Sequence, residues 1–166
     1  MGGMIAVKAY LRCSEKVKAL VLIDVAGVSR TAVEKIEQYM GDGWTLERLR
    51  KFYLDCVLGR LGKLNEERLR GKLQMMEDSG FRRAYLKSLN SISRLLSEKE
   101  VRRISVPTLI IWGSDDRLTP LEDGIKLSRL IPSSRLVVIN GAGHSPHSEA
   151  PEKVVEAILE FSKEIG

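Results

Sequence analysis

The sequence predicts an α/β fold, with a parallel sheet of three strands, flanking helices and an inserted helical cap. Three short apolar runs predict the strands, at residues 17–24 (VKALVLID), 107–112 (PTLIIW) and 135–139 (RLVVI). Runs of this length that are rich in Val, Leu and Ile are typical of parallel strands buried on both faces. Helical stretches separate them, so right-handed crossovers should bring the three strands into one open sheet.

Helices are expected to pack against this sheet. Residues 2–13 predict one whose small residues could approach a strand closely (Gly2, Gly3, Ala6 and Ala9). Pro151 opens a C-terminal helix in which apolar residues recur at helical spacing (Val154, Ile158, Phe161 and Ile165). Thr119, Pro120 and Glu122 announce another helix after the second strand. There the threonine suits the cap, the proline suits the first position, and the glutamate completes a capping box.

A segment of about 75 residues separates the first two predicted strands, far more than the usual connection in such folds. Thr31 and Glu34 predict a capping box at its start. Apolar residues that share one helical face predict three further helices: Leu46, Leu49, Tyr53 and Cys56; Leu69, Leu73 and Met76; Tyr85, Leu89, Ile92 and Leu96. We therefore expect a core formed by residues 1–28 and 104–166 and a helical cap or lid at 29–103. Packing between helices explains most of these apolar positions, so no substrate residue is assigned among them.

The charge distribution argues against nucleic acid as a partner. The chain of 166 residues has a formal net charge of +5, and the excess lies in residues 29–103, with 17 basic and 11 acidic residues. Acidic residues such as Glu34, Glu66 and Glu77 interrupt the basic ones, and no stacking aromatic residues alternate with them. This pattern is typical of a solvated helical face.

Composition also bears on compartment and on metal binding. No apolar run approaches the roughly 20 residues that cross a bilayer, and the start of the sequence has no charged leader, so we expect a soluble, cytoplasmic chain without a membrane partner. Cys13 and Cys56 lack metal-ligand spacing and are expected to be buried free thiols. We predict neither a metal site nor a cofactor.

The chemistry is expected where two of the strands end, because ligands of open α/β sheets bind beyond the carboxyl ends of the strands. The second strand is followed by GSDDRLTP, with Asp115 and Asp116, and the third by NGAGHSPH, with His144 and His147. A carboxylate and an imidazole therefore follow neighbouring strands. Hydrolysis by a nucleophilic hydroxyl needs such a pair, in which the imidazole moves the proton and the carboxylate orients it.

At these residues the sequence resembles the α/β-hydrolase family, whose triad runs in the order serine, acid, histidine. IIWGSDDRLTP is similar to the acid loop, in which the acid is the third residue after the glycine, which implies Asp116. GAGHSPHSEAPEKV is similar to the histidine loop and implies His144 as the base. The opening MGGMIAVKAYLRCSEKVKALVLID resembles the helix and strand after the nucleophile elbow, and residues 29–103 occupy the place of a helical lid. The resemblance extends over nearly the whole sequence.

The nucleophile is expected to be absent from this sequence. A typical elbow reads G-x-S-x-G-G, and Met1, Gly2 and Gly3 match only its last three residues, so the serine would stand one position before Met1. The resemblance then implies the backbone N–H of Met1 as one donor of the oxyanion hole. Members that cleave haloalkanes carry an Asp in place of the serine, and the residues present do not decide between the two.

Other polar residues of the two loops have simpler interpretations. Asp115 suits a turn or a helix cap, and His147 suits a surface position. Ser145 and Ser148 suit loop hydrogen bonding, because a nucleophile on the same loop as its base would leave the acid without a role.

Three hypotheses follow. The chain supplies the acid and base of a serine hydrolase, inactive alone and completed by an N-terminal half that acts with it on a small-molecule substrate. Alternatively, it is a non-catalytic module that hides an open sheet edge by binding a second copy or a complementing chain through the strand from Val17 to Asp24. The third hypothesis is an unrelated α/β domain, in which Asp116 and His144 would lie apart.

Overall fold

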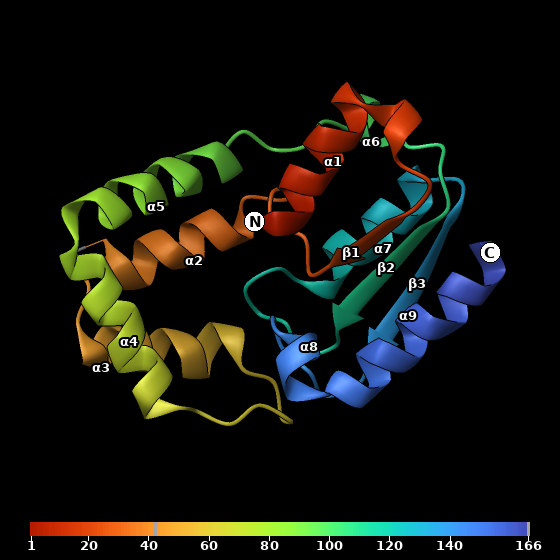
Figure 1. Cartoon of the computed structure of the whole chain (residues 1–166). Helices are drawn as coiled ribbons and strands as arrows, with labels where there is room; N and C mark the ends of the chain where they lie inside the picture. Colours follow the sequence, from red (N-terminus) through yellow and green to blue (C-terminus); the bar gives the residue numbers. More distant parts are fainter. Residues whose placement is uncertain (42, 166) are drawn as a thin grey trace.

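The computed structural model describes residues 1–41 and 43–165 and contains the predicted parallel sheet (Figure 1). Strands β1 (Leu20–Ile23), β2 (Thr108–Gly113) and β3 (Ser134–Ile139) lie in the order β1-β2-β3. All pairs are parallel, so the three strands end at one edge of the sheet. Strand β1 begins at Leu20, later than predicted, and a short 3-10 turn, η1 (Ser14–Lys16), precedes it.

Different helices cover the two faces of the sheet. Alternate residues of a strand point to opposite faces. Leu22, Ile110 and Trp112 therefore pack against α1 (Gly2–Arg12) and α7 (Leu121–Leu130) in one buried cluster. Leu109 and Ile111 pack on the other face, against the C-terminal helix α9 (Pro151–Ile165). The result is a core of three layers, which confirms the predicted fold class (Figure 1).

Helix α1 contacts the core mainly through large side chains and only partly through the predicted small ones. Met4, Val7 and Tyr10 are buried, whereas Ala9 is exposed. Gly3 does allow a close approach, because a Cβ at this position would lie 2.5 Å from a methyl carbon of Val25. The prediction of a small-residue face therefore holds at Gly3 and is wrong at Ala9.

The helical insertion between β1 and β2 has an apolar cluster of its own. It comprises α2 (Thr31–Met40), α3 (Leu46–Phe52) with a π-helical turn η2 (Tyr53–Val57), α4 (Glu66–Glu77), α5 (Ser79–Ile92) and α6 (Glu98–Val101). Helices α2 to α5 stand together beside the sheet, whereas α6 lies next to α1 (Figure 1). Leu49, Phe52 and Leu69 are central to the cluster of α2 to α5. Leu96 was predicted to share the face of α5, but it lies beyond that helix and packs in the core cluster of α1 and α7.

Two predicted helix caps are wrong. Helix α2 begins at Thr31 itself, with Arg30 as the N-cap and no side-chain cap. Helix α7 begins at Leu121, with Pro120 as the N-cap and no side-chain cap, so Thr119 is free for another role. A capping box is instead present at α6, between Ser97 and Glu100.

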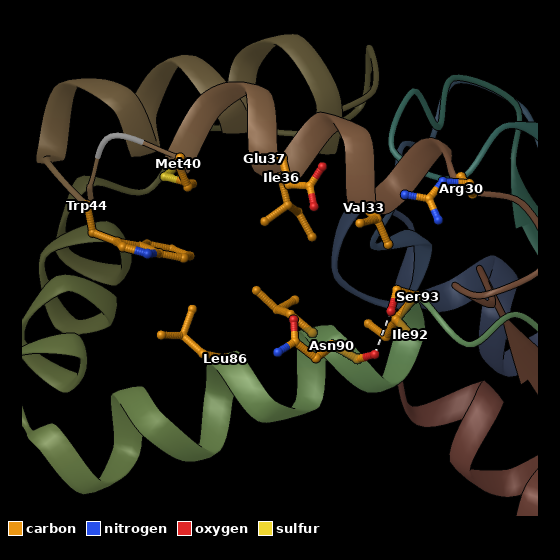
Figure 2. Close-up of a pocket in the computed structure, with 12 residues that line it drawn as sticks. Arg30, Val33, Ile36, Glu37, Met40, Trp44, Leu86, Asn90, Ile92 and Ser93 are labelled. Atoms are coloured by element: carbon orange, nitrogen blue, oxygen red, sulfur yellow. Dashed lines mark hydrogen bonds between the residues drawn. The ribbon is translucent and has the colours of Figure 1, made fainter.

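A cavity of about 400 Å³ lies between α2 and α5 (Figure 2). Ile36 of α2 and Leu86 of α5 point into it from opposite sides, and Trp44 closes one end (Figure 2). Its lining includes neither Asp116 nor His144.

Other residues complete the account of the fold. Cys56 is buried as predicted, whereas Cys13 is exposed, and both are free thiols. In α9, Val154 and Phe161 are buried but Ile165 is exposed. Across the described parts of the chain, no helix has both the length and the apolar character needed to cross a membrane.

Candidate active site

The loops after β2 and β3 bring Asp116 and His144 into contact. The Oδ2 atom of Asp116 lies 2.8 Å from Nδ1 of His144, although 28 positions separate the two residues. The carboxylate side chain is fully buried, whereas the imidazole keeps 22% of its surface exposed. The pair therefore has an orienting acid inside the protein and a base that solvent or a ligand can reach.

Four hydrogen bonds converge on the carboxylate of Asp116. Oδ1 accepts from the backbone N–H groups of Leu118 and Thr119, at 2.8 and 2.9 Å. Oδ2 accepts from the Thr119 hydroxyl at 2.5 Å as well as from His144. Because an ionised carboxylate only accepts, Nδ1 of His144 must carry the proton. The other ring nitrogen, Nε2, is left free to act as a base.

The histidine loop is held against the insertion by backbone contacts. The N–H of His144 donates to the carbonyl of Val57 at 2.7 Å. A Cβ on Gly143 would lie 2.2 Å from the same carbonyl, so this approach requires glycine. Glu149, in the short helix α8 (Pro146–Glu149), accepts from the N–H groups of Gly59 and Gly143, both at 3.0 Å. The end of η2 and its following loop therefore help to fix the position of the imidazole.

The remaining polar residues of the loops lie elsewhere. Asp115 accepts from the side chain of Arg60 at 2.8 Å, and this hydrogen bond, together with one from Ser114, lowers the pKa of Asp115 to about 2. His147 is exposed on α8. Ser148 contacts Arg68 at 3.3 Å. Among residues 1–41 and 43–165, the side-chain partners of the His144 ring are Asp116 and Thr119, and no serine hydroxyl is bonded to it.

Sequence analysis missed three residues of this site. Thr119 was interpreted as a helix cap, yet its hydroxyl binds Asp116 and lies 3.0 Å from Nδ1 of His144. Glu149 was not singled out. Asp24 was treated only as the end of a strand, but it is buried and bonds to Gly113, at the start of the acid loop. A charged residue directly after a strand, as Asp24 is, was the available signal.

Met1 lies at the start of α1, and its side chain packs against the apolar cluster of the insertion. The N-terminus is next to α2 in Figure 1. Leu118 of the acid loop is buried in the same cluster. The start of the chain and the acid loop therefore both contact the insertion.

The strands of this parallel sheet end beside a buried acid and a partly exposed histidine. The fold and the site together place the chain among α/β proteins with an acid–base site. The chain belongs to the alpha/beta hydrolase fold family, because the model of that family matches residues 1–151. This agrees with the resemblance found in the two loops.

Similar proteins share this fold and are longer. The chain is 30% identical over 166 residues to the 2-hydroxy-6-oxo-6-(2'-aminophenyl)hexa-2,4-dienoic acid hydrolase of Metapseudomonas resinovorans, covering 97% of this chain and 57% of that protein. A solved thermophilic esterase is 29% identical, with a TM-score of 0.71, over 99% of this chain and 63% of the esterase. The meta-cleavage product hydrolase of Pseudomonas fluorescens IP01 has a TM-score of 0.82 at 24% identity, over 99% of this chain and 62% of the hydrolase. The chain thus spans about three fifths of the length of these proteins.

Proposed function

We propose that this chain supplies the acid and base of a hydrolase that acts through a nucleophilic serine, with the serine coming from residues outside the present sequence. The contact of 2.8 Å between Asp116 and His144 carries the proposal. Asp116 holds the imidazole in the tautomer that leaves Nε2 free, which is the arrangement a general base requires.

The proposed reaction is acyl transfer to water. Nε2 of His144 takes the proton of the serine hydroxyl while its oxygen bonds to the substrate carbonyl carbon, and Asp116 stabilises the imidazolium that forms. The imidazolium then returns the proton to the leaving group, which departs as the acyl–serine forms. A water molecule, deprotonated by the same imidazole, releases the acid and restores the serine. The backbone N–H of Met1 is the proposed donor to the negatively charged carbonyl oxygen.

The proposed substrate has a carbonyl carbon next to an apolar group. Leu118 follows Asp116 by two residues and is buried in the apolar cluster of the insertion, so the acid loop adjoins apolar side chains. The names of similar proteins, an oxo-dienoic acid hydrolase and an esterase, both imply attack at such a carbonyl. The helical insertion is the proposed lid over this site.

A chimera tests the proposal. The N-terminal part of the Metapseudomonas resinovorans hydrolase, up to and including its nucleophile, is joined to Met1 of this chain and assayed with p-nitrophenyl esters. We expect hydrolysis that falls by at least about 100-fold in H144A and D116N, the usual range for loss of general-base catalysis. H147A should retain the rate, because His147 is exposed and outside the pair. The unextended chain should not exceed the rate of its own H144A variant. Equal rates for the chimera and its H144A variant would refute the proposal.

A second candidate function is self-association through β1. Among the described residues β1 pairs only with β2, and Val21 on this strand is 39% exposed. An unpaired strand edge of this kind is a template for another strand. If pairing occurs, light scattering gives a dimer for the native chain and a monomer for V21K, since a lysine on an edge strand opposes pairing. A native monomer would rule out this candidate.

A further inference from the structure

Asp24 occupies an unusual position at the end of β1. Its backbone φ angle is +41°, and only 3% of the surface of Asp24 is exposed. The left-handed region is uncommon for residues other than glycine, and Asn and Asp tolerate it best. The backbone N–H of Asp24 still donates to the carbonyl of Ile111 at 3.1 Å, so the residue is fixed to the end of β2.

The carboxyl group of Asp24 faces the acid loop. Its Oδ1 atom accepts from the N–H of Gly113 at 3.0 Å, whereas its Oδ2 atom is buried with no hydrogen-bond partner within the described residues. Gly113 also contacts the acid, since its carbonyl accepts from the N–H of Asp116 at 3.4 Å. Gly113 therefore connects Asp24 to Asp116, with its N–H bonded to the first and its carbonyl to the second. An unpaired buried oxygen is costly if it is a charged acceptor, but a protonated oxygen can serve as a donor.

The charges around Asp24 favour the protonated form. Burial is the largest influence on its pKa, and the carboxylates of Asp116, from the acid loop, and Glu149, from α8, add repulsion. Together they raise the pKa of Asp24 to about 8, although the Gly113 N–H opposes the shift. Asp116, in contrast, accepts four hydrogen bonds that compensate for its burial. The site thus has two neighbouring carboxyl groups in different environments, and burial and nearby charge favour the protonated form of Asp24.

We infer that Asp24 is a positioning residue of the Asp116–His144 pair. As a neutral carboxylic acid, Asp24 holds Gly113, the residue at which the acid loop begins. The inference rests on the proposed function only for its catalytic meaning. Asp116 is the carboxyl group that contacts the imidazole, and Asp24 lies behind it. When Asp24 ionises, a second negative charge appears behind Asp116 and stabilises the imidazolium, so the affinity of His144 for its proton changes with the state of Asp24.

NMR titration of the chain tests this coupling directly. The sequence has two histidines, so each ring signal can be assigned, and exposed His147 serves as an internal control. In the native chain we expect the carboxyl carbon of Asp24 to titrate near pH 8 and the His144 ring signal to show a second step over the same pH interval. In D24N the second step of His144 should vanish, while its behaviour below pH 7 stays close to native. His147 should show a single step in both proteins.

Asn is the suitable replacement, because it tolerates a positive φ and its amide oxygen can still accept from Gly113. An Asp24 carbon that titrates near pH 4 in the native chain overturns the inference, and this measurement does not depend on any variant folding. A pH 8 step of His144 that persists in D24N also overturns it. Neither measurement needs a nucleophile, so an inactive chimera would refute the proposed function and leave this result intact.

Discussion

The hydroxyl of Thr119 lies 2.5 Å from the same Asp116 oxygen that contacts His144. The three groups form a buried triangle, because the hydroxyl is also 3.0 Å from Nδ1 of the imidazole. Thr119 is almost fully buried, so water cannot replace its hydroxyl easily. The residue therefore contributes to how strongly Asp116 attracts the proton of the histidine.

Thr119→Val should reduce stability. Valine has nearly the shape of threonine but removes one of the four donors to the buried carboxylate of Asp116. We expect the free energy of unfolding to fall by about 1.5 to 3 kcal/mol, the usual value of a hydrogen bond to a charged group. Urea unfolding provides the measurement.

Thr119→Ser is the matched control, because it keeps the hydroxyl and removes only a methyl group. Its free energy of unfolding should fall by less than that of the valine variant. An equal loss of stability in the Ser and Val variants would show that packing, and not the hydrogen bond, determines the effect.

Gly143→Ala should destabilise the protein, since the added methyl group would lie 2.2 Å from the carbonyl of Val57 and 2.4 Å from the nitrogen of Gly59. Both neighbours are backbone atoms that cannot rotate away, so the loop or the insertion must move. We expect a loss of about 1 to 3 kcal/mol, as for other overpacked sites. The control is Gly71→Ala within α4, where a Cβ meets nothing within 4 Å and helix propensity predicts a gain of up to about 1 kcal/mol. Similar urea midpoints for the two variants would contradict this account.

Glu149→Ala should loosen the contact between the insertion and the histidine loop. The amides of Gly59 and Gly143 both donate to Oε2 of this side chain, and alanine leaves them without that acceptor. Hydrogen exchange at these two amides should accelerate by about 10-fold or more, which corresponds to the loss of a charge-assisted hydrogen bond. Glu149→Gln retains an acceptor and should exchange more slowly than the alanine variant. Unchanged exchange in Glu149→Ala would mean that the backbone alone holds the loop.

The sequence predicted the parts of the site that depend on chain order and local pattern. Three apolar runs determined the sheet, and the residues after two of them identified Asp116 and His144 as candidates for contact. The sequence could not reveal that the Thr119 hydroxyl binds Asp116 and does not cap α7. These two roles of the threonine differ only in local backbone geometry. The roles of Asp24 and Glu149 depend on contacts across 89 and 90 positions, which periodicity does not encode. Both predicted caps failed by one residue in opposite directions, because α2 begins one residue earlier than a cap at Thr31 requires and α7 one residue later than a cap at Thr119 requires.

The pH dependence of stability gives the last prediction, since Asp24 has a higher pKa in the folded chain than in the unfolded one. Its folded pKa is about 8, against 3.8 for an ordinary Asp. Between these values the folded state keeps a proton that the unfolded state has lost, so the contribution of Asp24 to stability decreases as the pH rises through this window. Asn at this position does not titrate. The free energy of unfolding of D24N relative to the native chain should therefore increase steadily from about pH 4 to about pH 8 and level off above it, as measured by urea unfolding at several pH values. Carboxylates remote from Asp24 are common to both proteins and cancel in the difference. A difference that stays constant over this range would show that Asp24 is ionised in the folded protein, with a compensating donor that its surroundings must then supply.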